Sequence, residues 1–308
     1  MQFINPKTDF AFKKIFGSEQ SKDILISFLN ALLYNGDRTI KHLEILNPYL
    51  APRIRGIKDT YLDVKATLDN DKTVIIEMQV LNVESFEKRI LYNAAKAYSI
   101  QLEAGEDYAM LNPVIALTIT DFEMFPNLDK VISSFILKER DFLIDYPIYD
   151  IELVFAELPK FQKELHQLET IADKWLYFLK TARSLQEIPE NMGDVPEIQQ
   201  AFEIANRSNL NREELEDLDN REIYIHDQRN VIKKALNQGI QQGIQQGLEQ
   251  GLEQGLEQGL EQGLEQGKIQ AKIEIVKQML LQFDDSTISQ ITQLSLEEIQ
   301  RLRKENQA

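Results

Sequence analysis

The chain lacks cysteine and has only three histidines, which narrows the chemistry open to it. With no Cys among 308 residues, a disulfide scaffold, a Cys-based zinc site and a thiol nucleophile are excluded, and a reducing compartment fits. His42, His166 and His226 lie far apart in the sequence, so they match no zinc-binding spacing.

Long apolar runs are also missing. The first residues, MQFINPKTDFAFKK, place Pro6 and Asp9 where a signal peptide needs an apolar stretch. No later run approaches the roughly 18 apolar residues of a membrane span. We therefore predict a cytoplasmic protein.

Positive charge is scarce overall but not at the front of the chain. The net charge is -16, yet residues 1–104 contain 14 Lys and Arg against 13 Asp and Glu. The remaining residues therefore carry the whole acidic excess of -17. This distribution leaves the first third compatible with a phosphate-rich partner such as nucleic acid.

The apolar content of 43% predicts a packed core. Apolar residues at three- and four-residue steps between Phe10 and Leu33 predict two helices interrupted at Gly17, and similar spacing over 86–102 predicts a third, ended by Gly105. Alternation in YLDVKATL and TVIIEMQV, separated by Asp69 to Asp71, predicts a β-hairpin. Further strands are expected over 114–120, 131–137 and 151–158.

After Pro159 the pattern is mostly helical, with Pro189, Gly193 and Pro196 marking the expected domain boundary. We predict a core domain over 1–188, a helical extension over 189–238, a glycine repeat over 239–267 and a small helical element over 268–308. In that last element Ser295 and Glu298 form a capping box, and a helical docking or capping role is favoured over a helix-turn-helix.

The repeat places Gly every fourth residue from Gly239 to Gly267, with Ile or Leu after each of the first seven. Both rows drift by roughly 40° per repeat around a helix. Eight glycines cost a lone helix roughly 8 kcal/mol relative to Ala. We therefore expect a flexible, partly helical spacer, with self-association as the alternative. A membrane-dimer motif is excluded because Gln and Glu fill the gaps.

The hairpin brings two carboxylates together. If paired positions sum to 140, Leu62 faces Met78 and Val64 faces Ile76, so the apolar faces coincide. Asp63 then lies opposite Glu77 with a Cβ separation near 5 Å.

Facing carboxylates repel unless a cation, a shared proton or water intervenes. A divalent metal would resolve the repulsion, and hard oxygen ligands suit Mg²⁺, which activates water and polarises phosphate. The alternative is a solvated polar face on which Lys65 neutralises one acid.

The combined motifs resemble the Rpn family of recombination-promoting nucleases and transposases, within the PD-(D/E)XK nucleases. Besides Asp63 and Glu77-Met78-Gln79, the resemblance rests on DFAFKKIFG at 9–17, RILY at 89–92, Gln101 with Gly105 and Tyr108, ELPKF at 157–161, and the repeat tail. It covers most of the chain. It implies an α/β fold, with a mixed β-sheet core flanked by helices and followed by a helical C-terminal region, and Mg²⁺-dependent cleavage of DNA phosphodiesters.

By position, the resemblance makes Asp63 and Glu77 metal ligands, joined by the Met78 carbonyl. Gln79 occupies the place of the usual Lys, and because a neutral amide cannot supply positive charge, Lys13 or Arg89 is the candidate to do so. Asp9 is either an additional acid of the site or an N-cap of the first helix. A catalytically silent DNA-binding or assembly protein with the same fold remains the alternative function.

Contacts to DNA are expected from basic and aromatic residues of the first third, namely Lys13, Lys14, Arg53, Arg55, Lys58, Arg89 and Tyr92. For Arg89 and Tyr92 the alternatives are an ion pair with a nearby acid and a place in the core. For Arg53 and Arg55 the alternative is ordinary surface charge. Phe10, Phe12 and Phe16 are expected in the core.

Overall fold

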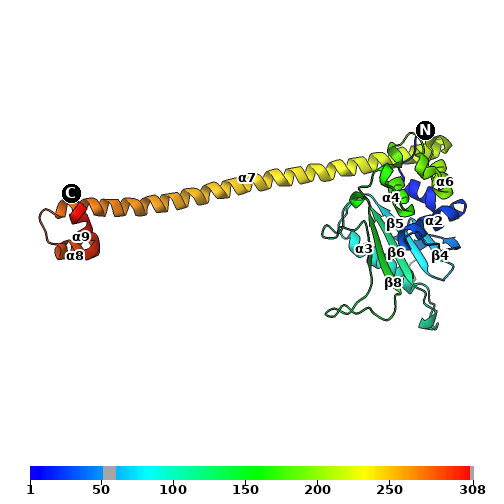
Figure 1. Ribbon diagram of the computed structural model, residues 1–308, viewed down its shortest axis with the longest axis horizontal. Helices are drawn as coiled ribbons and strands as arrows, with labels where there is room; N and C mark the ends of the chain where they lie inside the picture. Colours follow the sequence, from blue (N-terminus) through cyan, green and yellow to red (C-terminus); the bar gives the residue numbers. More distant parts are fainter. Residues whose placement is uncertain (51–59, 306–308) are drawn as a thin grey trace. The chain divides into compact units, whose positions relative to one another are not determined.

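The computed structural model describes residues 1–50 and 60–305. The chain divides into two compact units, Met1–Asn230 and Val231–Ala308. Figure 1 labels the main elements of both.

The first unit is built on a six-stranded mixed sheet with the order β1-β4-β5-β6-β8-β7. The strands are β1 (Leu43–Leu46), β4 (Val64–Leu68), β5 (Thr73–Gln79), β6 (Val114–Thr120), β7 (Ile132–Phe135) and β8 (Ile151–Glu157). β5, β6 and β8 run parallel, and the other pairs are antiparallel. A separate two-stranded sheet joins β2 (Tyr49–Leu50) to β3 (Thr60–Tyr61). The mixed α/β fold expected from the sequence is confirmed, whereas the short strands β1 and β2 were not predicted, and the strand expected from Tyr61 to Leu68 is divided into β3 and β4.

The hairpin of β4 and β5 has the predicted register. Val64 pairs with Ile76 and Ala66 with Val74, and Asp71 adopts a positive φ of 62° in the turn. The expected pairing of Leu62 with Met78 is wrong. The chain leaves the ladder at Asp63, and Leu62 donates its N–H to Pro48 O at 3.1 Å.

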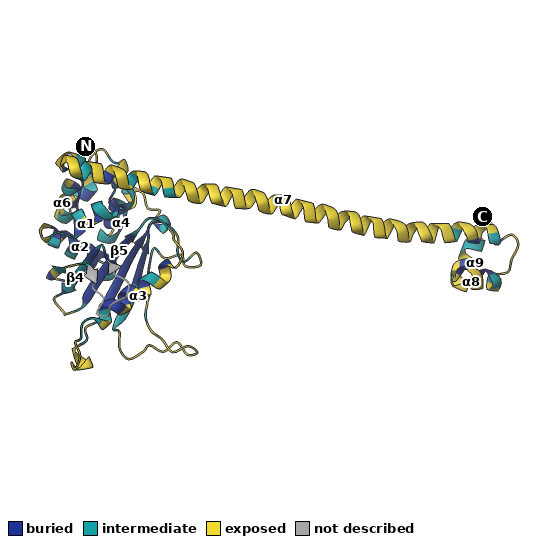
Figure 2. Cartoon of the chain, turned by 180° about the vertical axis from the view of Figure 1, so that it is seen from behind, coloured by how far each residue is buried: buried dark blue, intermediate teal, exposed yellow. Residues whose placement is uncertain are grey.

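Helices cover both faces of the sheet (Figures 1 and 2). The α-helices of this unit before its last one are α1 (Asp9–Phe16), α2 (Lys22–Leu33), α3 (Phe86–Ser99), α4 (Ile171–Thr181), α5 (Glu190–Gly193) and α6 (Pro196–Ile204). Short 3₁₀ turns occupy Glu19–Ser21, Tyr108–Met110, Leu158–Lys160, Leu165–Gln167, Ala182–Ser184 and Arg207–Asn209. The largest core cluster packs α1, α2, α4 and α6 against one face of the sheet, while α3 packs against the other.

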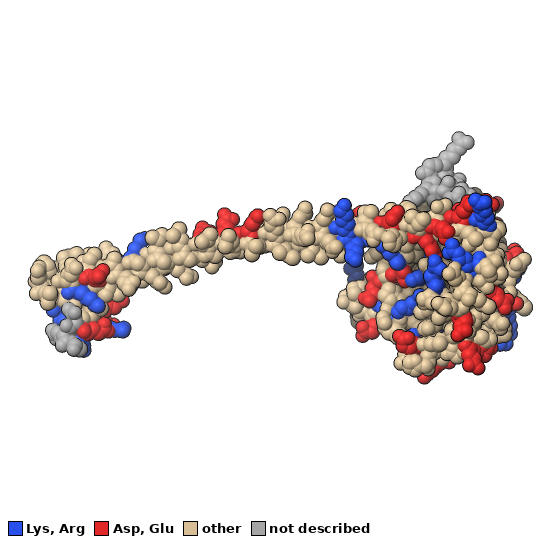
Figure 3. All heavy atoms as spheres, turned by 90° about the horizontal axis from the view of Figure 1, so that it is seen from above, with Lys and Arg blue, Asp and Glu red and all other residues tan. Residues whose placement is uncertain are grey.

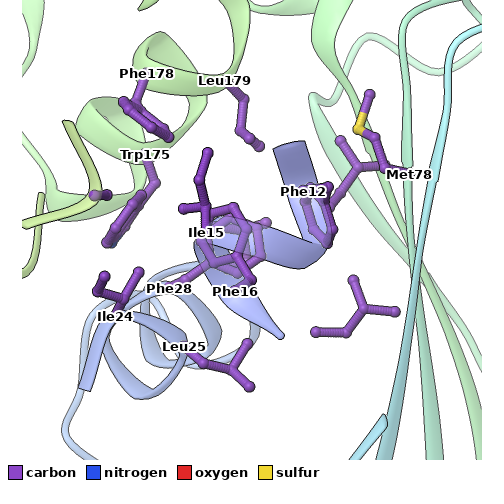
Figure 4. Packing of buried hydrophobic residues seen from close by; sticks show 14 of the residues in the cluster. Phe12, Ile15, Phe16, Ile24, Leu25, Phe28, Met78, Trp175, Phe178 and Leu179 are labelled. Atoms are coloured by element: carbon purple, nitrogen blue, oxygen red, sulfur yellow. The ribbon is translucent and has the colours of Figure 1, made fainter. Parts of the chain in front are cut away.

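The centre of the main core is aromatic (Figure 4). Phe12 and Phe16, fully buried as expected, pack with Phe28 and Trp175, and the centroids of the Phe16 and Phe28 rings lie 4.6 Å apart. The Trp175 indole N–H donates to Ser27 Oγ at 3.2 Å, so the single tryptophan has its polar group satisfied. Phe10 is partly buried against this core.

Residues after 188 belong to the same compact unit. Met192, Ile198 and Phe202 are fully buried in the main core, and so is Leu218 in the first turns of the last helix. The boundary expected at 188 therefore falls inside the first unit.

Helix α7 (Arg212–Met279) is continuous through the glycine repeat. The prediction that 239–267 is only partly helical is therefore wrong. Leu, Glu and Gln, which dominate the repeat with Gly, are good helix formers, so only one residue in four opposes the helix. The side chains of the repeat, 239–267, are exposed throughout (Figure 2), with Leu256 at 67%.

The end of the second unit is a small helical cluster. Val276 and Leu280 pack with Ile288 of α8 (Asp285–Thr292) and Ile299 of α9 (Leu296–Glu305). The capping box expected at Ser295 is confirmed, since Ser295 N–H donates to Glu298 at 3.0 Å and Glu298 N–H to Ser295 Oγ at 3.3 Å.

Candidate active site

Asp63 lies at the bend where the chain enters β4. Its backbone N–H donates to Ile76 O at 3.2 Å, and its side-chain Oδ2 accepts from Met78 N–H at 2.8 Å. The carboxylate thus takes the place of a backbone acceptor beyond the end of the β4 ladder. The Asp63 side chain is only 11% exposed, and Lys13 Nζ lies 3.4 Å from Oδ1.

Glu77 lies near the carboxyl end of β5, on the face that packs against α3. Its side chain is 15% exposed, with Arg89 Nη2 3.3 Å from Oε1. Asn93, also on α3, donates to Oε2 at 3.4 Å. Both α3 contacts come from positions four residues apart, which share one face of a helix.

The pKa values of both carboxyls are raised. Burial is the main reason that the pKa of Asp63 is raised, with the Met78 N–H and Lys13 opposing it. Burial also raises the pKa of Glu77, Arg89 opposes it, and the charge of Asp63 adds to the rise.

The solvated polar face considered from the sequence is therefore wrong, because both carboxyls are largely buried. Lys65 forms no ion pair within the described part of the chain, and burial lowers its pKa. The counterions of the two acids are Lys13 and Arg89 instead.

Gln79 and Arg89 are linked at the end of β5. Arg89 Nη2 donates to Gln79 Oε1 at 2.6 Å, while Gln79 Nε2 donates to Leu81 O at 2.8 Å. The guanidinium carbon also lies 4.9 Å from the centre of the Phe86 ring. Positive charge is thus placed beside the neutral amide by a residue of the neighbouring helix.

Asp9 is the first residue of α1 but does not cap it. Thr8 is the N-cap, and its Oγ1 accepts from Ala11 N–H. The N-cap interpretation of Asp9 is therefore wrong. Asp9 pairs instead with Arg221 of α7, and its charge contributes to raising the pKa of Asp63.

Comparison of the sequence with models of protein families found a match. The model of the PD-(D/E)XK nuclease family transposases matches residues 6–235. The chain belongs to this family. Searches of curated proteins and of solved structures gave no match.

As a member of the PD-(D/E)XK nuclease family transposases, the chain has a nuclease-related function and an implied DNA substrate. The matched range extends into α7 and includes Arg221, which contacts Asp9. None of the helices described here combines the length and apolar character needed to cross a bilayer.

The donor set of the site fits a divalent cation, which nucleases of this superfamily generally use. The described residues hold no group of three or more His, Cys, Asp or Glu side chains arranged to bind a metal. Asp63 and Glu77 nevertheless offer hard oxygen atoms, and repulsion from the charge of Asp63 contributes to the raised pKa of Glu77. A cation between the two would relieve that repulsion.

The other residues predicted to contact DNA differ in their exposure and in their ion pairs. Lys13 is 44% exposed, and Lys14 is paired with Glu214 of α7. Tyr92 is 39% exposed rather than in the core, with Lys96 Nζ 5.8 Å from its ring centre. Arg53, Arg55 and Lys58 lie outside the described residues.

Sequence reasoning missed three participants near the site: Asn93, Asp121 and Arg221. Asn93 follows Arg89 by one helical turn, so the spacing was a usable signal. Asp121 follows β6 directly, and its N–H donates to Gln79 O at 3.0 Å. Arg221 is more than 200 residues from Asp9, and no local pattern reports such a contact.

Proposed function

We propose that this protein is a Mg²⁺-dependent endodeoxyribonuclease that hydrolyses DNA phosphodiester bonds in a recombination- or transposase-related role. The observation that carries the proposal is the pair of largely buried carboxyls, Asp63 and Glu77, at the end of the β4–β5 hairpin. Asp63, Glu77 and the Met78 carbonyl would hold the ion, which when bound supplies an activated water and a Lewis acid for the phosphate.

The chain's own residues position this chemistry. Asp63 is fixed by its bond from Met78 N–H, and Glu77 by its contacts with Asn93 and Arg89. Such fixed carboxylates lose little freedom on binding a cation, so the site is preorganised.

Gln79 and Arg89 together would replace the usual lysine, Gln79 by orienting water and Arg89 by supplying positive charge. Gln79 Oε1 retains a lone pair that can accept a hydrogen bond from water while Arg89 occupies the other. Arg89, at 39% exposure, supplies the positive charge that stabilises a phosphate in the transition state. Lys13, beside Asp63, is the second source of charge, and Asp9 completes the acidic side of the site.

The DNA backbone is proposed to contact Lys13, Lys14, Arg53, Arg55, Lys58, Arg89 and Tyr92. Lys and Arg are interspersed with Asp and Glu on the visible face of the first unit (Figure 3). Phosphate binding must therefore come from local groups rather than a uniformly basic surface. Replacing Arg53 and Arg55 with Ala should weaken binding across sequences and flatten its salt dependence, and an unchanged salt slope would contradict their placement.

Cleavage of supercoiled plasmid tests the proposal. The wild-type chain is expected to nick the plasmid with Mg²⁺ and not with a chelator, and Asp63→Asn is expected to abolish nicking. Asp37→Asn is the matched control, because this exposed Asp lies in the loop after α2 and not in the β4–β5 hairpin. Nicking that persists in Asp63→Asn contradicts the site, whereas no nicking with any divalent metal favours the catalytically silent DNA-binding protein.

The repeat is proposed to act in spacing or self-association rather than in the chemical step. Between 239 and 267 its charged residues are all Glu, so it offers no cation to phosphate. Its exposed Ile and Leu row would be covered if chains associate. Sedimentation of the full chain over a wide concentration range tests this, and a monomer throughout would leave spacing as the role.

A further inference from the structure

A second cluster of charged residues lies beside the candidate site. Asp121, 14% exposed, follows β6 and is tied by its N–H to Gln79 O at 3.0 Å. Lys7 Nζ lies 2.9 and 3.0 Å from its two oxygens, and Arg229 Nη2 donates to Oδ2 at 2.6 Å. Two cations from opposite ends of the first unit's sequence thus converge on one carboxylate.

The charge balance of this cluster differs from that of the neighbouring pairs. Lys13 with Asp63, Arg89 with Glu77 and Arg221 with Asp9 each match one cation to one acid. Lys7, Arg229 and Asp121 carry one positive charge in excess. An excess cation beside a site that would handle phosphodiesters favours binding of an anion.

The geometry leaves Arg229 accessible to a ligand, while the Lys7 side chain is only 16% exposed and adds its charge to the same position. The Arg229 side chain is 50% exposed, and the recorded bond to Asp121 uses only one of its terminal nitrogens. A guanidinium has five donors in a planar fork that matches a phosphate, while the Lys7 ammonium acts as a compact charge. A phosphate oxygen can therefore take the place that the Asp121 carboxylate occupies.

We propose that Lys7 and Arg229 bind a DNA backbone phosphate next to the scissile one, and that the Asp121 carboxylate pairs with both cations while DNA is absent. The inference rests on the proposed nuclease function, because it names a further contact with the same substrate. It makes the first turns of α7 part of the DNA-binding surface.

The competing explanation is a structural clamp, in which Lys7, Asp121 and Arg229 only fix the segment of α7 that belongs to the first unit. Other contacts already do so: Leu218 is fully buried in the core, and Lys14–Glu214, Arg183–Glu222 and Arg207–Asp219 pair across the same segment. Arg229 is therefore not required to fix the start of α7.

Salt-dependent DNA binding of the full chain separates the two explanations. Binding of a labelled duplex is followed by fluorescence anisotropy in a Glu77→Gln background, which removes cleavage. Arg229→Gln is compared with Arg212→Gln, a matched loss of charge on the same helix at a side chain that is 93% exposed. We expect Arg229→Gln to bind about fivefold to tenfold more weakly near 0.1 M salt, with a salt slope smaller by about 1.

Asp121→Asn should change the DNA affinity in the direction opposite to Arg229→Gln. Removing the competing carboxylate frees two cations, so DNA should bind more tightly, whereas a clamp would lose its acid and binding would weaken or stay unchanged. Equal salt slopes for Arg229→Gln and Arg212→Gln would also overturn the inference. If the background chain binds no DNA at all, the proposed function fails with it.

Discussion

Glu77 and the glutamates of the repeat have different environments, and the contrast separates the first unit from the repeat of α7. Glu77 is held at 15% exposure between Arg89 and Asn93, in a position that raises its pKa. The five glutamates of the repeat, from Glu249 to Glu265, are exposed on a stretch of α7 whose side chains are all exposed. Chemistry follows from the surroundings that a fold provides, so residue type alone does not identify a site.

The largest expected difference between the two regions is catalytic. Glu77→Gln should reduce plasmid nicking by about 1,000-fold, since loss of a charged metal ligand removes several kcal/mol of transition-state stabilisation. Glu257→Gln, the same chemical change in the repeat, should leave the nicking rate unchanged. Both rates are measured at saturating Mg²⁺ over single turnovers, and equal rates would remove Glu77 from the site.

Packing gives the next largest contrast. Phe28→Ala should destabilise the first unit by about 3–5 kcal/mol, because this fully buried ring contacts Phe16 and Trp175. Leu256→Ala, at a side chain 67% exposed, should change stability by less than about 0.5 kcal/mol. Thermal unfolding followed by fluorescence of the single tryptophan reports on this unit. A large loss in Leu256→Ala would show that the Leu row is covered in solution.

The sequence predicted the elements whose signal is local. The hairpin register from Val64 to Thr67 followed from matching two apolar faces. Beyond it the Asp63 carboxylate accepts from Met78 N–H, the residue after Glu77. The strands over 114–120 and 151–157 followed from β-branched runs. The strand Leu43–Leu46 was not predicted, because its four residues give little periodicity and no longer β-branched run surrounds them.

Contacts between distant segments were not predictable. Arg221 with Asp9 and Arg229 with Asp121 join residues more than 100 positions apart, and nothing in either local sequence names the partner. The N-cap alternative for Asp9 was wrong for a different reason: Thr8 and Asp9 are both good caps, and only the backbone conformation distinguishes them. Glu77 is largely buried because α3 packs over it. The alternation of apolar and polar residues in the strands therefore could not exclude an exposed acidic face.

The pH dependence of stability should sharpen the contrast between the two kinds of glutamate. Because the pKa values of Asp63 and Glu77 are raised, the folded chain binds their protons more tightly than the unfolded chain does. Their contribution to stability therefore falls as the pH rises from about 4 through the raised pKa values. Without divalent metal, Glu77→Gln should raise the Tm by about 2–4 °C at pH 8 and by less at pH 5.

Glu257→Gln is the control for this measurement, and its Tm should match the wild type at both pH values. Added Mg²⁺ should raise the wild-type Tm more than that of Glu77→Gln, because only the wild type retains both carboxylates. A lower Tm for Glu77→Gln at pH 8 would mean that the Arg89 ion pair outweighs the cost of burying the acid.

Glycine provides a contrast whose sign should reverse between the regions. A methyl group at Gly17, which ends α1, would lie 2.8 Å from Lys13 O and 3.4 Å from Val64 Cγ2. Gly17→Ala should therefore destabilise the first unit by about 1–3 kcal/mol. At Gly255 nothing lies within 4 Å of the added carbon, so Gly255→Ala should stabilise α7 by about 1 kcal/mol. Tryptophan fluorescence should detect only the first change, and circular dichroism at 222 nm should report the second as a helical signal that persists to higher temperature. If helices of different chains approach closely along the glycine row, Gly255→Ala would instead weaken association, which sedimentation of the full chain would reveal.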